Sequence, residues 1–496
     1  MTSHRPGSPR ANLPLAHQLS EPDAAAPRFL SHDACVALVQ QILGYTSRRG
    51  ITDIHVESAW RGDVRWARNR PHMAGDWRNQ TIQIGRGFRG WSVGSGFTTN
   101  QLDMGSLRTL MAWAERHLPL PGPGERPDDS VYAPVQQPYA RTHIWSDQTY
   151  AQTSEQRSTI ASQLITGAER AGMLSAGYLD VSARGLLHRT AYGQFLYAPQ
   201  TLAQCSMTVR DPEGTGSGWA GVSSYDWGRI DAATLAEIAL DKCLKSRNPV
   251  AVEPGRYTLI LEPQALFDFL EVGLADPKFI DRWNNENSDA FPFYLPPGQS
   301  PVPGQPGQTV TYKRTMIGEK VVDARISMRF DPTDPDLGVI PFTDDGEAVV
   351  PFITIDHGVL TTLNYHRDYA NTELHQQWGI PGVDSFRLDV SGPTATLEEM
   401  IATTRRGLLA TRMPSGISDF KSLSVTGYTR DGLWLIENGK ISKPVKNMRY
   451  TESNLGALNR VEQVGVPVPV FSPGDPAVCP PIKVRDFNFT YLMDAV

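Results

Sequence analysis

Three of the eleven histidines lie close together along the chain, at His357, His366 and His375, and Asp368 lies among them. Imidazole and carboxylate groups are zinc ligands, so these residue types could build a hydrolytic metal centre. Their spacing is not the i, i+4 pattern that places two imidazoles on one helix face, so a turn would have to bring them together. We therefore expect isolated surface or capping histidines here, and we keep these four residues as an alternative metal site.

Other motifs in the sequence point to structure rather than to chemistry. No HExxH or HExxxH motif occurs, so the common route to a hydrolytic zinc is missing. Residues 85–90 (GRGFRG) match the dinucleotide template GxGxxG, but strand-like residues follow them where that site needs a helix, which favours a glycine-rich hairpin. Residues 213–219 (EGTGSGW) lack the Lys-Ser/Thr of a phosphate-binding loop and predict a turn. Several acidic residues lie beside proline or glycine and are expected in turns: Asp331, Asp334, Asp336, Asp344 and Asp345.

Composition excludes several classes of protein. The chain has 496 residues and a net charge of −6, without the basic excess of a general nucleic-acid-binding protein. Its four cysteines form no CxxC pair, which argues against a disulfide framework and favours the cytoplasm. No apolar run is long enough for a transmembrane helix, so we expect no membrane association. Residues 1–28 lack the apolar segment of a signal peptide. We expect residues 1–30 to be a disordered leader, and deleting residues 1–28 to leave folding unaffected.

The patterning predicts an α+β fold in two domains. Residues 31–247 alternate helical and strand-like segments, with Ser31 as a helix N-cap and helices at 103–117, 153–172 and 232–246. This predicts an N-terminal α/β domain with helices on a strand meander. Residues 248–496 begin with a linker-like stretch and are then dominated by strand patterns, which predicts a mostly antiparallel β domain. Residues 284–311 are polar and rich in Pro, Gly and Gln, and we expect a long exposed loop.

The second half carries a series of motifs whose order and spacing resemble a known family. They are residues 318–322 (GEKVV), 329–332 (RFDP), 341–347 (PFTDDGE), 356–360 (DHGVL), 367–370 (RDYA), 431–446 (DGLWLIENGKISKPVK) and 449–455 (RYTESNL). Together they resemble the TldD/PmbA (TldE) family of peptidase subunits, and residues 434–440 are the most specific piece. The resemblance extends more weakly to residues 32–118.

The resemblance implies a cytosolic pair of related subunits. The TldD-like subunit carries zinc on a HExxxH motif and cleaves unfolded peptides in an enclosed cavity, while the TldE-like subunit lacks the metal ligands. Here the corresponding segment, residues 264–274 (QALFDFLEVGL), contains neither histidine. The third ligand, a C-terminal cysteine, is also missing, because no cysteine lies between residues 244 and 478. The chain is therefore closest to the TldE/PmbA-like branch. Glu271 resembles a general base but has no polarised water to activate. No catalytic or peptide-binding residue is assigned.

We expect a non-metal subunit of a TldD/TldE-type cytosolic metallopeptidase complex that degrades or matures unfolded or modified peptides. On this interpretation the chain holds no cofactor, zinc lies on a TldD-like partner, and the assembly is a heteromer or, failing that, a homodimer. Two alternatives stay open. One is a stand-alone enzyme with a rebuilt metal site near His366. The other is a non-catalytic protein that grips an extended peptide by edge-strand pairing.

Overall fold

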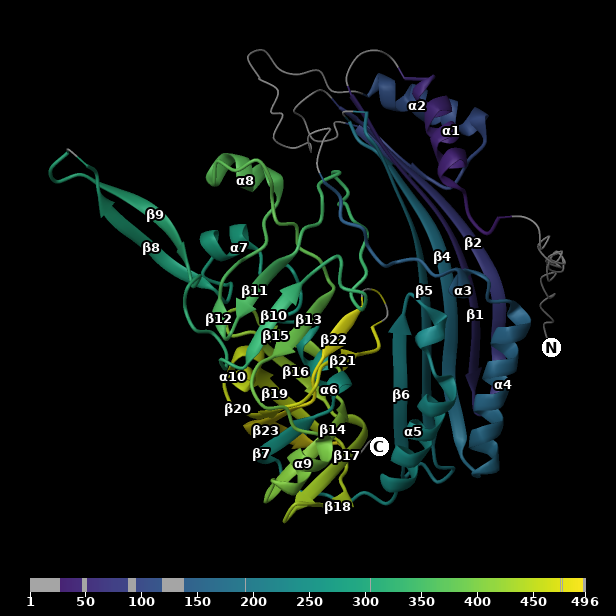
Figure 1. Ribbon diagram of the computed structural model, residues 1–496, viewed down its shortest axis with the longest axis vertical. Coiled ribbons are helices and arrows are strands. Elements are labelled where there is room, and N and C mark those ends of the chain that lie inside the picture. Colours follow the sequence, from purple (N-terminus) through teal and green to yellow (C-terminus); the bar gives the residue numbers. More distant parts are fainter. Residues whose placement is uncertain are drawn as a thin grey trace, which may run out of the picture.

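The computed structural model describes residues 27–46, 51–87, 95–117, 138–191, 193–303, 305–472, 474 and 476–493. Figure 1 shows two regions side by side, an N-terminal sheet with helices and a C-terminal region built mostly of strands. This is the mixed α+β architecture that the patterning predicts. Much of the predicted leader, most of the proline-rich segment at 119–139 and the end of the glycine motif at 85–90 lie outside the described residues. No helix among the described residues is long and apolar enough to cross a membrane.

The N-terminal region is organised around one antiparallel sheet with the strand order β3-β2-β1-β4-β5-β6. Buried residues alternate along β1 with less buried ones, because successive side chains of a strand point to opposite faces. Arg68 and Asn69, both at positive φ, form the two-residue turn between β1 and β2. The strands are β1 Ile51–Ala67, β2 Arg70–Gly87, β3 Ser95–Thr99, β4 Leu174–Arg189, β5 Phe195–Arg210 and β6 Ser217–Ser224.

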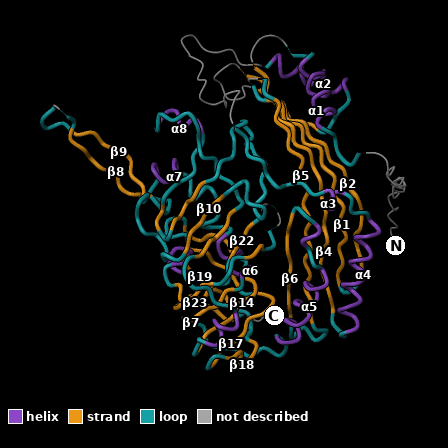
Figure 2. Tube along the Cα trace, in the orientation of Figure 1, coloured by secondary structure: helices purple, strands orange, loops and turns teal. Residues whose placement is uncertain are grey.

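Four helices cover one face of this sheet. The first two, α1 and α2, pack on Ile54, Val56 and Leu187 near one end of the strands. The next two, α4 and α5, pack on Trp60 and Val181 farther along the same face. Figure 2 shows α1 and α4 on the side of the sheet away from the C-terminal region, whereas α5 borders that region, with Trp434 Nε1 donating to the carbonyl oxygen of Lys245 at 3.3 Å. The other face of the sheet contributes Leu196 and Ala198 to an apolar cluster with Phe342 of the C-terminal region. The helices of this region are α1 His32–Leu43, with Ser31 as its N-cap, α2 Met104–Arg116, α3 Asp147–Tyr150, α4 Ser154–Arg170, the short η2 Trp227–Arg229 and α5 Ala232–Lys245.

The C-terminal region contains two larger sheets around one apolar core. The first has the order β12-β11-β10-β13-β22-β21, and the second β15-β16-β19-β23-β7-β14-β17-β18, with β20 beside β23. Their pairs are antiparallel except β13 with β22 and β7 with β14. The strands are β7 Gly255–Leu261, β10 Ile326–Phe330, β11 Phe352–Asp356, β12 Val359–Leu360, β13 Phe386–Val390, β14 Arg406–Arg412, β15 Ser415–Asp419, β16 Ser424–Tyr428, β17 Arg430–Glu437, β18 Lys440–Pro444, β19 Met448–Ser453, β20 Val461–Val464, β21 Val468–Pro469, β22 Ala477–Cys479 and β23 Ile482–Leu492.

Short helices join these strands, and residues 284–311 depart from the sequence-based expectation. The helices are α6 Pro263–Leu270, α7 Arg282–Asn287, α8 Arg367–Glu373, α9 Leu397–Ala402 and α10 Asn454–Leu458. Instead of a long loop, the chain completes α7 and then forms the hairpin β8 Tyr294–Pro301 and β9 Thr309–Thr315, which projects from the body in Figure 1. The sequence pattern did not predict β8, because prolines are uncommon within strands. They are tolerated because β8 has a single partner strand and an irregular register between Leu295 and Gly298.

Buried polar contacts join the two regions. The side-chain amide of Gln204 on β5 donates to the carbonyl oxygen of Ser472 at 2.6 Å, and the hydroxyl of Ser223 on β6 donates to the same oxygen at 2.8 Å. The hydroxyl of Ser217 donates to the Asp431 carboxylate at 2.6 Å. Because these groups are buried, each hydrogen bond is costly to break, and together they fix the two regions relative to one another.

Candidate functional site

Helix α6 occupies the segment at which the resemblance to the TldD/PmbA family implies a metal-binding helix. Glu262 and Pro263 begin it directly after β7, and its residues 264–270 are all buried. The carboxylate of Asp268 accepts hydrogen bonds from Arg412 Nε at 2.6 Å, from the Met413 amide at 3.0 Å and from Gln264 Nε2 at 3.0 Å. This carboxylate is committed to structural partners, so α6 presents a closed ion pair where a metal centre would need free ligands.

Glu271 follows the last turn of α6. Desolvation, and then repulsion from Asp268, raise the pKa of Glu271 to about 7. A carboxyl group that titrates near neutrality is able to exchange protons at working pH. Helix α6 itself contains no histidine. The helix therefore offers a proton-exchanging group and no imidazole pair to hold a hydrolytic metal.

A pocket of about 510 Å³ lies in the C-terminal region between α7 and α8. Among its lining residues are Asp281, His366 and Asp368, with aromatic walls from Trp283 and Tyr369. Burial raises the pKa of Asp281, and the nearby His366 opposes that shift. The structure thus brings two of the four predicted metal-site residues, His366 and Asp368, to one pocket.

The other two predicted residues lie apart from any such grouping. His357 is exposed in the turn between β11 and β12, with Nδ1 2.7 Å from the Asp356 carboxylate. His375 is exposed after α8, and both histidines have positive φ. Across the described residues, the four do not form a set of three whose ligand atoms lie within 4.8 Å of one another. A metal site near His366 stays a prediction.

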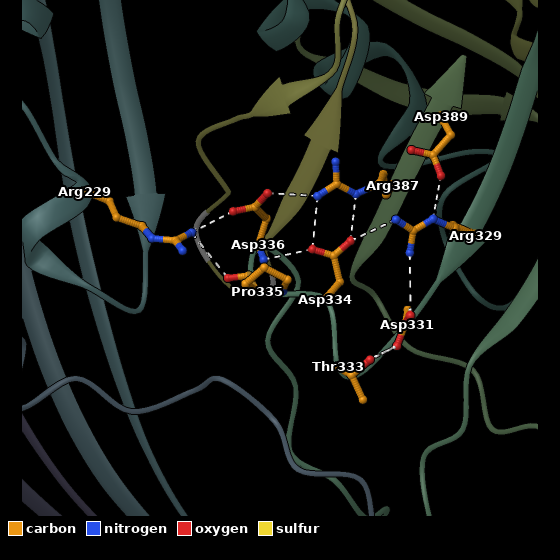
Figure 3. Close-up of polar contacts among 9 residues, drawn as sticks. All are labelled: Arg229, Arg329, Asp331, Thr333, Asp334, Pro335, Asp336, Arg387 and Asp389. Atoms are coloured by element: carbon orange, nitrogen blue, oxygen red, sulfur yellow. Dashed lines mark hydrogen bonds and ion pairs between the residues drawn. The ribbon is translucent and has the colours of Figure 1, made fainter. Parts of the chain in front are cut away.

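Three of the five acidic residues expected in turns, Asp331, Asp334 and Asp336, form a network with arginines (Figure 3). Asp331 accepts from the Thr333 amide at 2.9 Å, as a turn residue does. The Asp334 carboxylate accepts two hydrogen bonds from Arg387, at 2.8 and 3.0 Å, and one from Arg329 at 3.0 Å. Desolvation opposes ionisation, yet the Arg387 contacts hold the pKa of Asp334 below its usual value. Asp336 pairs with Arg387 and, at 2.6 Å, with Arg229 of the N-terminal region. The network is structural.

The sequence analysis did not identify one cluster of side chains of the kinds that bind metal ions. Asp53 and His55 on β1 and His188 on β4 are the one group of three such side chains, within the part of the chain that is described, whose ligand atoms lie within 4.8 Å of one another. Burial opposes ionisation of Asp53, but hydrogen bonds from His188 and His55 lower its pKa to about 2. The sequence does show that Asp53 and His55 are two residues apart in a strand-like segment, and therefore lie on the same face of that strand. Its partner His188 is remote in sequence, and only the pairing of β1 with β4 brings it close.

Comparison with known proteins gives a match in the C-terminal region. Residues 303–491 match the PmbA/TldA metallopeptidase C-terminal domain. A metalloprotease from Archaeoglobus fulgidus is 23% identical over 195 residues, covering 35% of this chain. That match spans 45% of the relative's length, so less than half of that protein is represented.

Three solved structures share the fold over nearly the whole chain. A proposed modulator of DNA gyrase from Thermotoga maritima has a TM-score of 0.70 at 14% identity, covering 92% of this chain and 100% of that one. A second such protein, from Bacteroides thetaiotaomicron, has a TM-score of 0.71 at 16% identity, with 92% and 99% covered. TldE from Thermococcus kodakarensis has a TM-score of 0.71 at 15% identity, again with 92% and 99% covered. At these identities the likeness shows the fold alone.

Proposed function

We propose that the chain is a TldE-like subunit of the PmbA/TldD metallopeptidase family, without zinc on α6, which pairs with a zinc-bearing TldD-like subunit; the match of residues 303–491 to the C-terminal domain of that family supports this role. In this role the partner's zinc cleaves unfolded or modified peptides. This chain completes the assembly and the walls around the substrate. The complex acts in the cytoplasm.

The state of α6 carries the proposal. The segment offers Asp268 and Glu271 where the resemblance implies two histidines, and Arg412, Met413 and Gln264 already hold the Asp268 carboxylate. A zinc ion at this helix would have to displace a buried, charge-assisted ion pair, and only oxygen ligands would replace it. The fold shared with TldE over 92% of the chain supports the same role.

Native mass spectrometry of the tagged chain, purified from its own cells, tests the proposal. We expect a complex with a related subunit of similar mass, and zinc that stays with that subunit when the complex is dissociated. A homo-oligomer with peptidase activity of its own would overturn the subunit role.

Variants of the complex separate this proposal from a stand-alone enzyme. Glu271→Gln removes the proton-exchanging group near α6, and His366→Ala removes an imidazole from the C-terminal pocket. If the partner's zinc performs the cleavage, peptidase activity of either variant complex stays within about twofold of the parent. Loss of activity in His366→Ala, with the complex intact, would favour a rebuilt site on this chain.

A further inference from the structure

The cluster of Asp53, His55 and His188 lies on the face of the N-terminal sheet opposite its helices. His55 and His188 are directly opposed in the antiparallel pairing of β1 with β4, so their side chains project from the same face. Asp53 lies two residues before His55 on β1 and points the same way. Strand register alone therefore places two imidazoles and one carboxylate together on the face turned toward the C-terminal region.

Both imidazoles are aimed at the carboxylate. His55 Nε2 lies 3.0 Å from Asp53 Oδ1, and His188 Nε2 lies 2.9 Å from Asp53 Oδ2. The two rings are stacked, with centroids 3.9 Å apart and planes inclined by 15°. Each imidazole thus faces a different oxygen of one carboxylate, and ligand atoms of three residues of types that bind zinc lie within 4.8 Å of one another.

The cluster is open to solvent on one side, and Arg189, which interacts electrostatically with Asp53, lies on the other face of the sheet. Arg86 and Arg189 are the nearby cations, and strand alternation puts both on the helix-covered face, where they donate to Thr52. The residue paired with Asp53 on β2 is Gly85, so no side chain stands there. The side chains of His55 and Asp53 are 16% and 17% exposed, while that of His188 is fully buried, so an ion can enter from the side of His55.

We propose that Asp53, His55 and His188 form a binding site for a divalent transition-metal ion of the zinc class. Zinc–ligand distances of about 2.0–2.2 Å at a tetrahedral angle require ligand atoms about 3.3–3.6 Å apart. The present 2.9 and 3.0 Å separations, which end on different oxygens of Asp53, therefore need to open by about 0.3–0.7 Å, which small rotations of the three side chains supply. Two imidazoles with one carboxylate suit zinc, iron(II) or nickel rather than magnesium or calcium, and leave a coordination position open.

Metal binding replaces the two hydrogen bonds to Asp53 by coordination. Each neutral imidazole presents the lone pair of Nε2 and carries its proton on Nδ1. Among the described residues, His188 Nδ1 has no hydrogen-bond partner, so its protonation breaks no other contact. The site lies outside α6 and does not depend on the proposed subunit role, because all three ligands come from this chain.

Titration of the untagged, EDTA-treated full chain with Zn²⁺, in a calorimeter and by native mass spectrometry, tests the site. We expect one ion per chain, and a melting temperature that rises with Zn²⁺. His55→Ala and Asp53→Asn should weaken binding at least about tenfold and remove that rise. His55 is partly exposed, so its variant avoids the folding risk of the buried His188.

His375→Ala is the matched control, since His375 is an exposed histidine remote from the cluster, and it should bind Zn²⁺ like the parent. Co²⁺ substitution adds a spectroscopic readout, because its visible absorption reports nitrogen ligation and should change in His55→Ala. Absence of stoichiometric binding would overturn the proposal. So would binding that survives His55→Ala and Asp53→Asn, or that is lost in His366→Ala. Because the titration uses the isolated chain, a failure to bind Zn²⁺ would not contradict the proposed pairing with a TldD-like subunit.

Discussion

The buried carboxylate of Asp268 on α6 and the partly buried guanidinium of Arg412 on β14 form an ion pair with a 2.6 Å contact to Nε. The same guanidinium lies 4.1 Å from the ring centroid of Trp219 on β6. Arg412 thus links α6 of the C-terminal region to β6 of the N-terminal sheet. The pair holds the position of α6, the helix whose sequence lacks the two histidines that the resemblance implies.

Asp268→Ala is expected to destabilise the chain by about 2–4 kcal/mol, because it leaves the Arg412 charge and the Met413 amide without their buried acceptor. Denaturant unfolding followed by circular dichroism measures the change. Asp241→Ala removes an exposed pair with Lys245 and should cost about 0.5 kcal/mol or less. Equal effects of the two variants would contradict the structural role of the α6 pair.

Glu347→Gln should change the pH dependence of stability. Desolvation, and then repulsion from Asp345, raise the pKa of Glu347 from 4.5 to about 7. A raised folded-state pKa means that the stabilisation from the protonated carboxyl is fully present below about pH 4.5 and is lost as the pH rises to about 7. Since glutamine stays neutral, the variant should be more stable than the parent by about 1–3 kcal/mol at pH 8 and nearly equal to it at pH 4.5.

Unfolding at the two pH values in the same buffer series makes this comparison. Glu237→Gln, an exposed position on α5, is the control and should show no pH-dependent difference from the parent. A Glu347→Gln variant that is less stable than the parent at pH 8 would show that the carboxylate is held ionised by its surroundings.

Local patterns predict much of this fold, because periodicity and capping are properties of neighbouring residues. Ser31 begins α1, and the 3.6-residue period locates α4 and α5 within two residues of their observed ends. The contacts that position the candidate sites could not be predicted in this way. The partners of Asp336 are Arg387 and Arg229, about 50 and 100 residues away, and His188 meets His55 only through the β1–β4 register.

Arg28 changes the expectation that residues 1–28 are dispensable. Its guanidinium lies 3.8 Å from the Trp60 ring centroid and donates to the carbonyl oxygens of Tyr150 and Gln152. Arg28→Ala should therefore cost about 1–2 kcal/mol through the lost cation–π contact and hydrogen bonds. Thermal unfolding compares it with Arg141→Ala, an exposed position that should have little effect. If Arg28→Ala also unfolds like the parent, these contacts add no stability and the prediction for the deletion of residues 1–28 stands.

Gly346 is the point at which a C-terminal loop closes over the end of the N-terminal sheet. It has φ +81°, and an added Cβ would lie 2.6 Å from Thr190 Cγ2 and 3.6 Å from His188 Cε1. Gly346→Ala therefore combines a left-handed backbone with a steric clash between the regions. Gly214→Ala is its matched control, because Gly214 has φ +73° and nothing within 4 Å of the added Cβ. The control should lose about 1 kcal/mol from the backbone alone, and Gly346→Ala about 1–3 kcal/mol more. That excess, measured by denaturant unfolding, reports how rigidly the loop is held against Thr190, just after β4. An excess of zero would mean that the loop moves away from Thr190 without cost.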